Sequence, residues 1–191
     1  WTALHLSVNS QLYQKHDGSK LIDVLINAGA DLNQKNNDGN TALNLAVIND
    51  RLNEFFVLLN AKSDVNILDN DEWTPLINAV GNNNIRMVKA LIKAGADVNK
   101  ASNDGWGPLH RTVNGYEYQE HNGSELAKLL IENGADVNQQ TNSGNTALNL
   151  ATSNNRLSEF FVLMNAEADI NISNSSQWTP LVNAISNNNL I

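Results

Sequence analysis

The sequence predicts an all-α fold, a solenoid of repeated helix pairs, and three observations carry this prediction. A short phrase of Thr or Gly, then Ala or Pro, then Leu occurs six times along the 191 residues. A second phrase, ending in Asp, an aliphatic residue and Asn, closes five of the units. Successive opening phrases lie 33 or 39 residues apart. Such self-similarity is typical of arrays in which each unit packs only on its neighbours, so six starts predict six repeats.

The opening phrase predicts the first helix of each repeat. Thr is a preferred helix N-cap, and Pro is tolerated in the first turn, where its missing N–H would have no partner anyway. The Leu of the phrase begins an apolar stripe, which we expect to be buried in every repeat. The equivalent positions are Leu4, Leu43, Leu76, Leu109, Leu148 and Leu181.

The closing phrase predicts the end of a second helix. Residues 87–92 are one example, because their apolar side chains recur at spacings of three and four and share one side of a helix. Gly95 is expected to end that helix in a left-handed conformation. Lys62 and Glu167 replace this Gly in the second and fifth repeats, and a side chain there costs about 1–2 kcal/mol.

The second helices of the second and fifth repeats are unusually rich in large apolar residues. We expect these residues to be core, and their burial to offset the strain at Lys62 and Glu167. They are Phe55, Phe56, Leu58, Leu59, Phe160, Phe161, Leu163 and Met164.

This pair of phrases, at fixed register over the whole chain, resembles the ankyrin repeat family. The resemblance implies an ankyrin-repeat solenoid, a curved stack of helix-turn-helix repeats with hairpin-like finger loops. We expect one ankyrin repeat domain over residues 1–191. Its approximate repeats are 1–39, 40–72, 73–105, 106–144, 145–177 and 178–191, the last incomplete.

A larger unit of three repeats has been duplicated. A shift of 105 residues aligns Trp1 with Trp106 and His5 with His110, and over half of the aligned positions are identical. The insertion that lengthens the first repeat of each block is copied with it. We therefore expect the chain to be a fragment of a longer ankyrin array.

Composition disfavours several classes of partner. The formal net charge is −8 and the 12 Lys and Arg residues are scattered, so a surface that neutralises nucleic-acid phosphates is not expected. No polybasic stretch and no apolar run near 18 residues is present, which argues against membrane binding or insertion. Without cysteine there is no disulfide framework or thiolate metal site, and the compartment stays open, with an intracellular one slightly favoured.

Histidine is the one residue type that suggests catalysis or metal binding. His5 and His110 stand where the family's imidazole bonds to neighbouring loop backbone, and duplication explains their pairing. His16 and His121 lack further ligands at metal-binding spacing. No Ser-His-Asp order, phosphate loop or zinc motif is present, so we expect no enzyme, metal or cofactor.

In the ankyrin family, partners usually meet the finger tips and the exposed side of the first helix, which together form a concave face. The equivalent finger positions here are Lys35, Asn37, Asp38, Asn40, Asn70, Asp71, Trp73, Asn103, Asp104, Trp106, Asn142, Ser143, Asn145, Ser175, Ser176 and Trp178. Trp1 occupies the same position in the first repeat.

All four tryptophans share one finger position, immediately before the opening phrase. An indole there either anchors a partner or packs along the neighbouring finger and stiffens the array. We expect Trp73 and Trp106 to be central to the surface, and acidic neighbours Asp71 and Asp104 to favour a partner with a basic patch.

Two further sets of residues are candidates. Tyr13 and Tyr118 lie in the inserted segments, where each either contacts a partner or covers a helix end. The terminal Asn of the closing phrase resembles sites that asparaginyl hydroxylases modify in ankyrin proteins, with Asn66, Asn99 and Asn138 as candidates.

The sequence favours a scaffold that binds a folded protein or an extended peptide. Two alternatives remain open: an architectural spacer or spring within a long array, and a targeting or regulatory module of a parent enzyme or channel.

Overall fold

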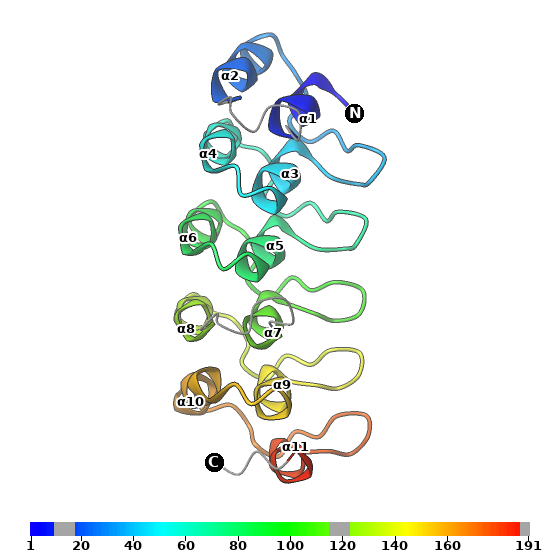
Figure 1. The fold of residues 1–191 in the computed structure, drawn as a ribbon, viewed down its shortest axis with the longest axis vertical. Helices are drawn as coiled ribbons and strands as arrows, with labels where there is room; N and C mark the ends of the chain where they lie inside the picture. The colour runs from blue at the N-terminus through cyan, green and yellow to red at the C-terminus, as the bar shows by residue number, and fades with distance from the viewer. Residues whose placement is uncertain (10–17, 115–122, 188–191) are drawn as a thin grey trace. The chain divides into compact units, whose positions relative to one another are not determined.

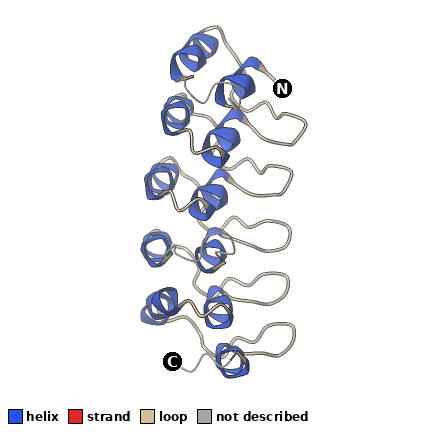
Figure 2. Ribbon diagram, in the orientation of Figure 1, coloured by secondary structure: helices blue, strands red, loops and turns tan. Residues whose placement is uncertain are grey.

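The computed structural model describes residues 1–9, 18–114 and 123–187, and every regular element in these ranges is an α-helix (Figures 1 and 2). The chain divides into two compact units, Trp1–Asp97 and Val98–Ile191. The first contains α1 (Ala3–Val8), α2 (Ser19–Asn27), α3 (Ala42–Ile48), α4 (Leu52–Asn60), α5 (Pro75–Gly81) and α6 (Ile85–Lys93). The second contains α7 (Pro108–Val113), α8 (Ser124–Glu132), α9 (Ala147–Ser153), α10 (Leu157–Asn165) and α11 (Pro180–Ser186). The predicted all-helical fold is confirmed.

Each unit is built from two layers of helices. In the first unit, α1, α3 and α5 form one row, α2, α4 and α6 form the other, and the finger loops project beside the first row (Figure 1). Within this unit the two helices of each repeat pack on each other, and the equivalent helices of successive repeats also pack together. In the second unit, α7, α9 and α11 form one row and α8 and α10 the other. Stacking thus supplies the core that a single helix pair lacks.

The predicted N-caps of the first helices are present. In five repeats the Thr side chain accepts a hydrogen bond from the backbone N–H three residues later, at Thr2, Thr41, Thr74, Thr146 and Thr179. Pro75, Pro108 and Pro180 occupy the first helical turn, as expected. These local choices fix where each first helix begins.

The apolar stripe of the first helices is confirmed at five of the six predicted positions. Leu4, Leu43, Leu76, Leu109 and Leu148 are at most 2% exposed. Leu181 is 66% exposed, so the prediction is wrong there. The other first helices pack on a second helix of their own repeat, whereas α11 packs on α9 and no second helix follows it in the described ranges.

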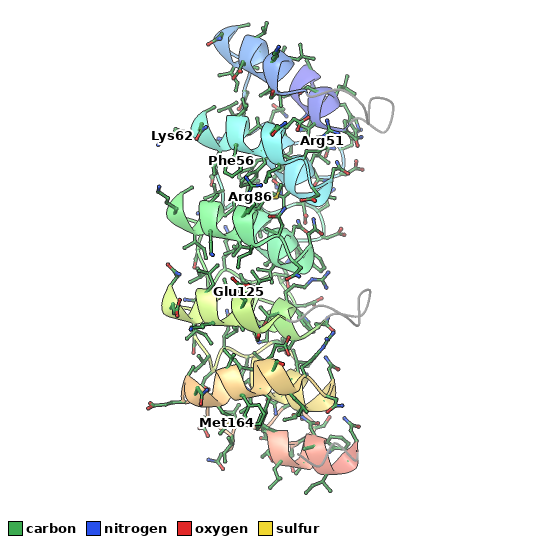
Figure 3. All side chains as sticks on the ribbon, turned by 60° about the vertical axis from the view of Figure 1, so that its left-hand side comes forward. Arg51, Phe56, Lys62, Arg86, Glu125 and Met164 are labelled. Atoms are coloured by element: carbon green, nitrogen blue, oxygen red, sulfur yellow. The ribbon has the colours of Figure 1, made fainter. Side chains whose placement is uncertain are left out.

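The ends of the second helices show the expected left-handed residues. Gly95 has φ of +92°, and the non-glycine residues Lys62 and Glu167 have φ of +70° and +60°. A side chain in this region is strained by about 1–2 kcal/mol. Figure 3 shows Lys62 and Arg51 at opposite ends of α4.

The apolar residues expected to offset this strain are only partly core. Phe55, Leu58 and Leu163 are fully buried. Four are half-buried, namely Phe56, Leu59, Phe160 and Met164. Phe161 is 53% exposed, and its assignment to the core is wrong. Its counterpart Phe56 lies on the side of α4 that faces α6 (Figure 3), whereas no described second helix packs on α10 at the equivalent place.

Side-chain amides of the closing phrase join successive repeats. The Oδ1 of each Asn accepts the backbone N–H of the Asp that begins the next closing phrase, at 2.8–2.9 Å. The pairs are Asn33–Asp64, Asn66–Asp97, Asn99–Asp136 and Asn138–Asp169. We call this set of four bonds the asparagine ladder.

The two described histidines are structural, as the resemblance implied. The Nδ1 of His5 accepts the Thr2 N–H at 3.0 Å, and its Nε2 lies 2.9 Å from the Asn40 carbonyl oxygen. His110 Nδ1 likewise accepts the Gly107 N–H, at 3.1 Å, and its Nε2 lies 2.9 Å from the Gln139 carbonyl oxygen, on the other side of the neighbouring finger from the position that corresponds to Asn40. A neutral imidazole with its proton on Nε2 satisfies both bonds.

Asn replaces His at the equivalent position of the second and fifth repeats and plays the same part. Asn149 accepts the Thr146 N–H at 2.9 Å through Oδ1, and its Nδ2 donates to the Ile172 and Trp178 carbonyls, each at 3.3 Å. The amide and the imidazole thus link the helix cap to the finger in the same way, but only the imidazole titrates.

Acid is therefore expected to destabilise the fold through these histidines. Burial lowers the pKa of both, although hydrogen bonds to the Asn40 and Gln139 carbonyls oppose the shift. The unfolded chain then binds protons more readily, so stability is complete above the unfolded pKa of about 6.5 and falls as pH drops below it, by up to about 1.4 kcal/mol per pH unit for each His.

The measurement is the urea midpoint between pH 8 and pH 5 for the natural chain and for the double variant H5N/H110N, in which Asn takes the place it already holds in other repeats. The loss of stability in this range should shrink in the double variant. Equal losses in the two proteins would contradict the assignment.

Ser63 carries an isolated buried hydroxyl. Its side chain is 6% exposed, and its Oγ has no hydrogen-bond partner. Ala30, Ala96, Ala135 and Ala168 occupy the same position in other repeats. Ser63→Ala should therefore raise the free energy of unfolding by about 1 kcal/mol, because an unsatisfied buried group is removed. The reverse change Ala168→Ser is the matched control and should lower it; thermal denaturation measures both.

A substitution of Leu91 tests whether the apolar face of the second helices is part of the core. It is fully buried on α6 beside Met87 and Val88. Leu91→Ala should destabilise by about 2–5 kcal/mol, since a cavity remains where the side chain packed. Urea denaturation measures the change, and an unchanged midpoint would show that this face is not core.

Candidate partner-binding surface

Each finger is shaped by the polar side chain at its base. Five such residues accept the backbone N–H four residues later, at 2.8–3.2 Å. The pairs are Asn36–Asn40, Asp69–Trp73, Ser102–Trp106, Thr141–Asn145 and Asn174–Trp178. These bonds close each turn and set the position of the residue before the first helix, which is a Trp in three of these fingers.

Neighbouring fingers within a unit are joined at their tips. In the first unit, the Asn70 N–H donates to the Asp38 carbonyl at 3.3 Å, and the Asn70 Nδ2 donates to the Asn37 carbonyl at 3.1 Å. In the second unit, Asn142 donates from the same two groups to Asp104 and Asn103, and the Ser175 N–H donates to the Ser143 carbonyl. The fingers of a unit are therefore linked to one another by hydrogen bonds, and their side chains project from this linked set of loops.

The predicted finger residues are largely available to a partner. Eleven of the polar ones are exposed, namely Lys35, Asn37, Asp38, Asn70, Asp71, Asn103, Asp104, Asn142, Ser143, Ser175 and Ser176. Asn40 and Asn145 are half-buried at the finger bases. Tyr13, Tyr118, His16 and His121 lie outside the described residues.

The tryptophans combine packing with exposure. Trp1 is 49% and Trp178 40% exposed, and Trp73 and Trp106 are half-buried. Trp1 and Trp106 each set a ring edge-on to the histidine of their own first helix, with centroids 6.0 and 5.9 Å apart. One side of the indole thus stabilises the finger while part of the ring stays open to solvent. Trp73 and Trp106 belong to different units, so their use as a pair stays a prediction.

Charge separates the fingers of the two duplicated blocks. Five charged residues of the fingers at 34–40 and 67–73 are neutral at the positions 105 residues later. The pairs are Lys35 and Gln140, Asp38 and Ser143, Asp69 and Asn174, Asp71 and Ser176, and Glu72 and Gln177. The repeated phrases do not reveal this divergence, which appears only when the two blocks are compared position by position.

Asp69 differs from the other finger charges because it is buried, at 7% exposure. Its Oδ1 accepts the Trp73 N–H at 2.8 Å, and its Oδ2 accepts Nδ2 of Asn78 on α5 at 3.0 Å. This carboxylate is engaged in holding the finger to the first helix, so it is a structural group and not a contact residue.

The candidate hydroxylation sites belong to the asparagine ladder. Asn66 and Asn99 also donate through Nδ2 to the carbonyls of Gly95 and Gly134, at 3.2 and 3.0 Å. Modification of these side chains stays a prediction, and an enzyme that draws Asn66 or Asn99 out of its place must break both bonds. Asn138 makes the ladder bond to Asp169.

Two searches of the described part of the chain bear on chemistry and membranes. No group of three or more His, Cys, Asp or Glu side chains in residues 1–9, 18–114 and 123–187 is placed to hold a metal ion. Within the same ranges, no helix has the length and apolar character needed to cross a bilayer.

Comparison with known proteins identifies the family. A family model for three copies of the ankyrin repeat matches residues 53–120 and 118–191. A model for many ankyrin repeats matches residues 25–77, and a single-repeat model matches residues 1–37. No curated protein matches the chain. Ankyrin repeats are generally protein–protein interaction modules and typically not enzymes. On these matches, which span most of the sequence, the chain belongs to the ankyrin repeat family.

Proposed function

We propose that this chain binds a protein partner on its fingers and first helices, and that the fingers of the first unit select a basic segment of that partner. One observation carries the proposal: two adjacent fingers, at 34–40 and 67–73, hold charges that the duplicated block lacks at every equivalent position. Asp69 is a structural group, but the same turn is closed by the neutral Asn174 in the duplicated block, so the other four charges are not needed to make the finger fold.

The charges lie close together on a connected surface. The finger tips are joined through the Asn70 N–H and the Asp38 carbonyl, and Asp38 and Asp71 are both exposed. Together with the half-buried Glu72 and the exposed Lys35, they give these two fingers a net negative charge. Like charges held this close repel one another, so they cost some stability in the free protein, and a cationic partner relieves that repulsion.

Trp73 lies at the base of the same acidic finger. It is half-buried, and its backbone N–H is held by Asp69 at 2.8 Å. An indole with one face packed and the other exposed offers large contact area with little loss of side-chain freedom on binding. We propose that Trp73 supplies binding affinity, while the surrounding carboxylates orient the cationic partner and raise its association rate.

The duplicated block offers a matched test of the charges. In the quadruple variant K35Q/D38S/D71S/E72Q each residue takes the identity that it already has 105 positions later, so folding should be retained. A peptide array of basic, neutral and acidic sequences, followed by calorimetry on the best binder, measures the effect. We expect basic peptides to bind the natural chain, the association rate to fall with added salt, and both properties to be lost in the variant.

Trp73→Ala should weaken the same complex by about tenfold or more, because truncation of a desolvated interfacial Trp typically costs about 2 kcal/mol. Arg86→Ala, at an exposed position on second helix α6, is the control and should leave the affinity unchanged. Loss of binding with Arg86→Ala but not with Trp73→Ala would place the surface on the second helices. Failure of every peptide and protein partner to bind would favour the architectural spacer.

A further inference from the structure

Two second helices carry a buried carboxylate in their apolar face. Glu54 is the third residue of α4 and Glu159 the third residue of α10, and they are 3% and 2% exposed. The same position is Met87 in α6 and Leu126 in α8, both buried and apolar. A charge at such a place is costly unless hydrogen bonds satisfy it, so each Glu needs a specific partner.

The partner in both cases is the backbone of the preceding repeat. Glu54 Oε1 accepts the Gly18 N–H at 3.0 Å, and Glu159 Oε1 accepts the Gly123 N–H. Gly18 and Gly123 are the N-cap residues of α2 and α8, and neither helix has a side-chain cap of its own. The carboxylate of one repeat therefore caps the second helix of the repeat before it.

Glycine is required at these two caps. A Cβ at Gly18 would lie 2.4 Å from the carbonyl oxygen of Ser7, and one at Gly123 would lie 2.2 Å from that of Thr112. Ser7 and Thr112 are in the last turns of α1 and α7. The N-termini of α2 and α8 thus pack closely against the last turn of the first helix in the same repeat and against the Glu of the next repeat.

The Glu–Gly pair occurs only where the preceding repeat has the six-residue insertion. The first and fourth repeats contain it, at 9–18 and 114–123, and the repeats that follow them contain Glu54 and Glu159. Met87 and Leu126 belong to repeats that follow ones without an insertion. In two pairs of successive repeats the insertion and the buried carboxylate therefore occur together, and in two other pairs both are absent.

We propose that Glu54 and Glu159 are positioning residues that fix the N-caps of α2 and α8, and that they make the opening of each cap cooperative with the following repeat. The backbone at Gly18 then opens only when the contact with α4 opens, rather than fraying with the first turn of α2. Glu54 is also bonded to Arg51, with Nη2 2.5 Å and Nε 3.1 Å from Oε1. The experiment must separate the two roles of this carboxylate.

Amide hydrogen exchange of the full chain, read by NMR at Gly18 and Gly123, tests the proposal. Glu54→Met installs the residue that α6 has at this position and removes the acceptor. Exchange at Gly18 should accelerate by about tenfold to a hundredfold, the range for a lost hydrogen bond to a charged group, while exchange at Gly123 stays unchanged. Glu159→Met should give the reverse pattern.

Two further variants complete the design. Glu54→Gln keeps an acceptor oxygen without charge and should retain most of the protection at Gly18, which also covers the case in which Glu54→Met does not fold. Arg51→Met removes the ion pair while keeping the carboxylate that accepts the Gly18 N–H, and should leave Gly18 protected. The proposal is overturned if Gly18 exchanges as slowly in Glu54→Met as in the natural chain, if Arg51→Met and Glu54→Gln both abolish the protection, or if Glu54→Met accelerates Gly123 equally.

Discussion

The side-chain amide that ends one repeat satisfies the backbone of the next, and the stack depends on this arrangement. A pair of short helices buries too little apolar surface to fold alone, so each repeat must be held in register with its neighbour. The asparagine ladder does this with a bond of nearly constant length at each of four junctions, from Asn33 to Asp64 through Asn138 to Asp169. The burial of the leucines and the bonds between neighbouring fingers depend on that register.

The sequence predicts the elements whose cause is local. Thr41, Pro75 and Gly95 each act within their own turn. The repeated phrases and their spacing were therefore enough to predict the positions of the N-caps, the first helical turns and the helix ends. Burial could not be predicted in the same way, because it depends on what lies across the next helix. Leu181 and Phe161 have the pattern of core residues but lack a covering second helix among the described residues.

The place of the candidate surface residues on the fingers could be predicted from the sequence, but their packing could not. Finger register placed the tryptophans correctly, whereas their partial packing on His5 and His110 required the structure. The burial of Glu54 could not be predicted, because a single carboxylate on an amphipathic helix normally marks the side of the helix that faces solvent. Its partner, Gly18, lies 36 residues away, and no local pattern connects the two.

The bond from Glu54 to Gly18 also limits how this array can be rearranged by recombination. The asparagine ladder is the same connector at each of four junctions, so on that ground alone any of the repeats it joins could follow any other. A repeat with the insertion, however, has a glycine N–H that donates to the Glu at the third position of the next second helix. Moved singly, such a repeat would lose the acceptor of this N–H, and the Glu left at the old junction would lose this donor and keep only its remaining bonds, such as that of Glu54 to Arg51. Where a repeat contains the insertion, the smallest unit that can be exchanged without losing this bond is therefore that repeat together with the one that follows it. Elsewhere the smallest unit is a single repeat.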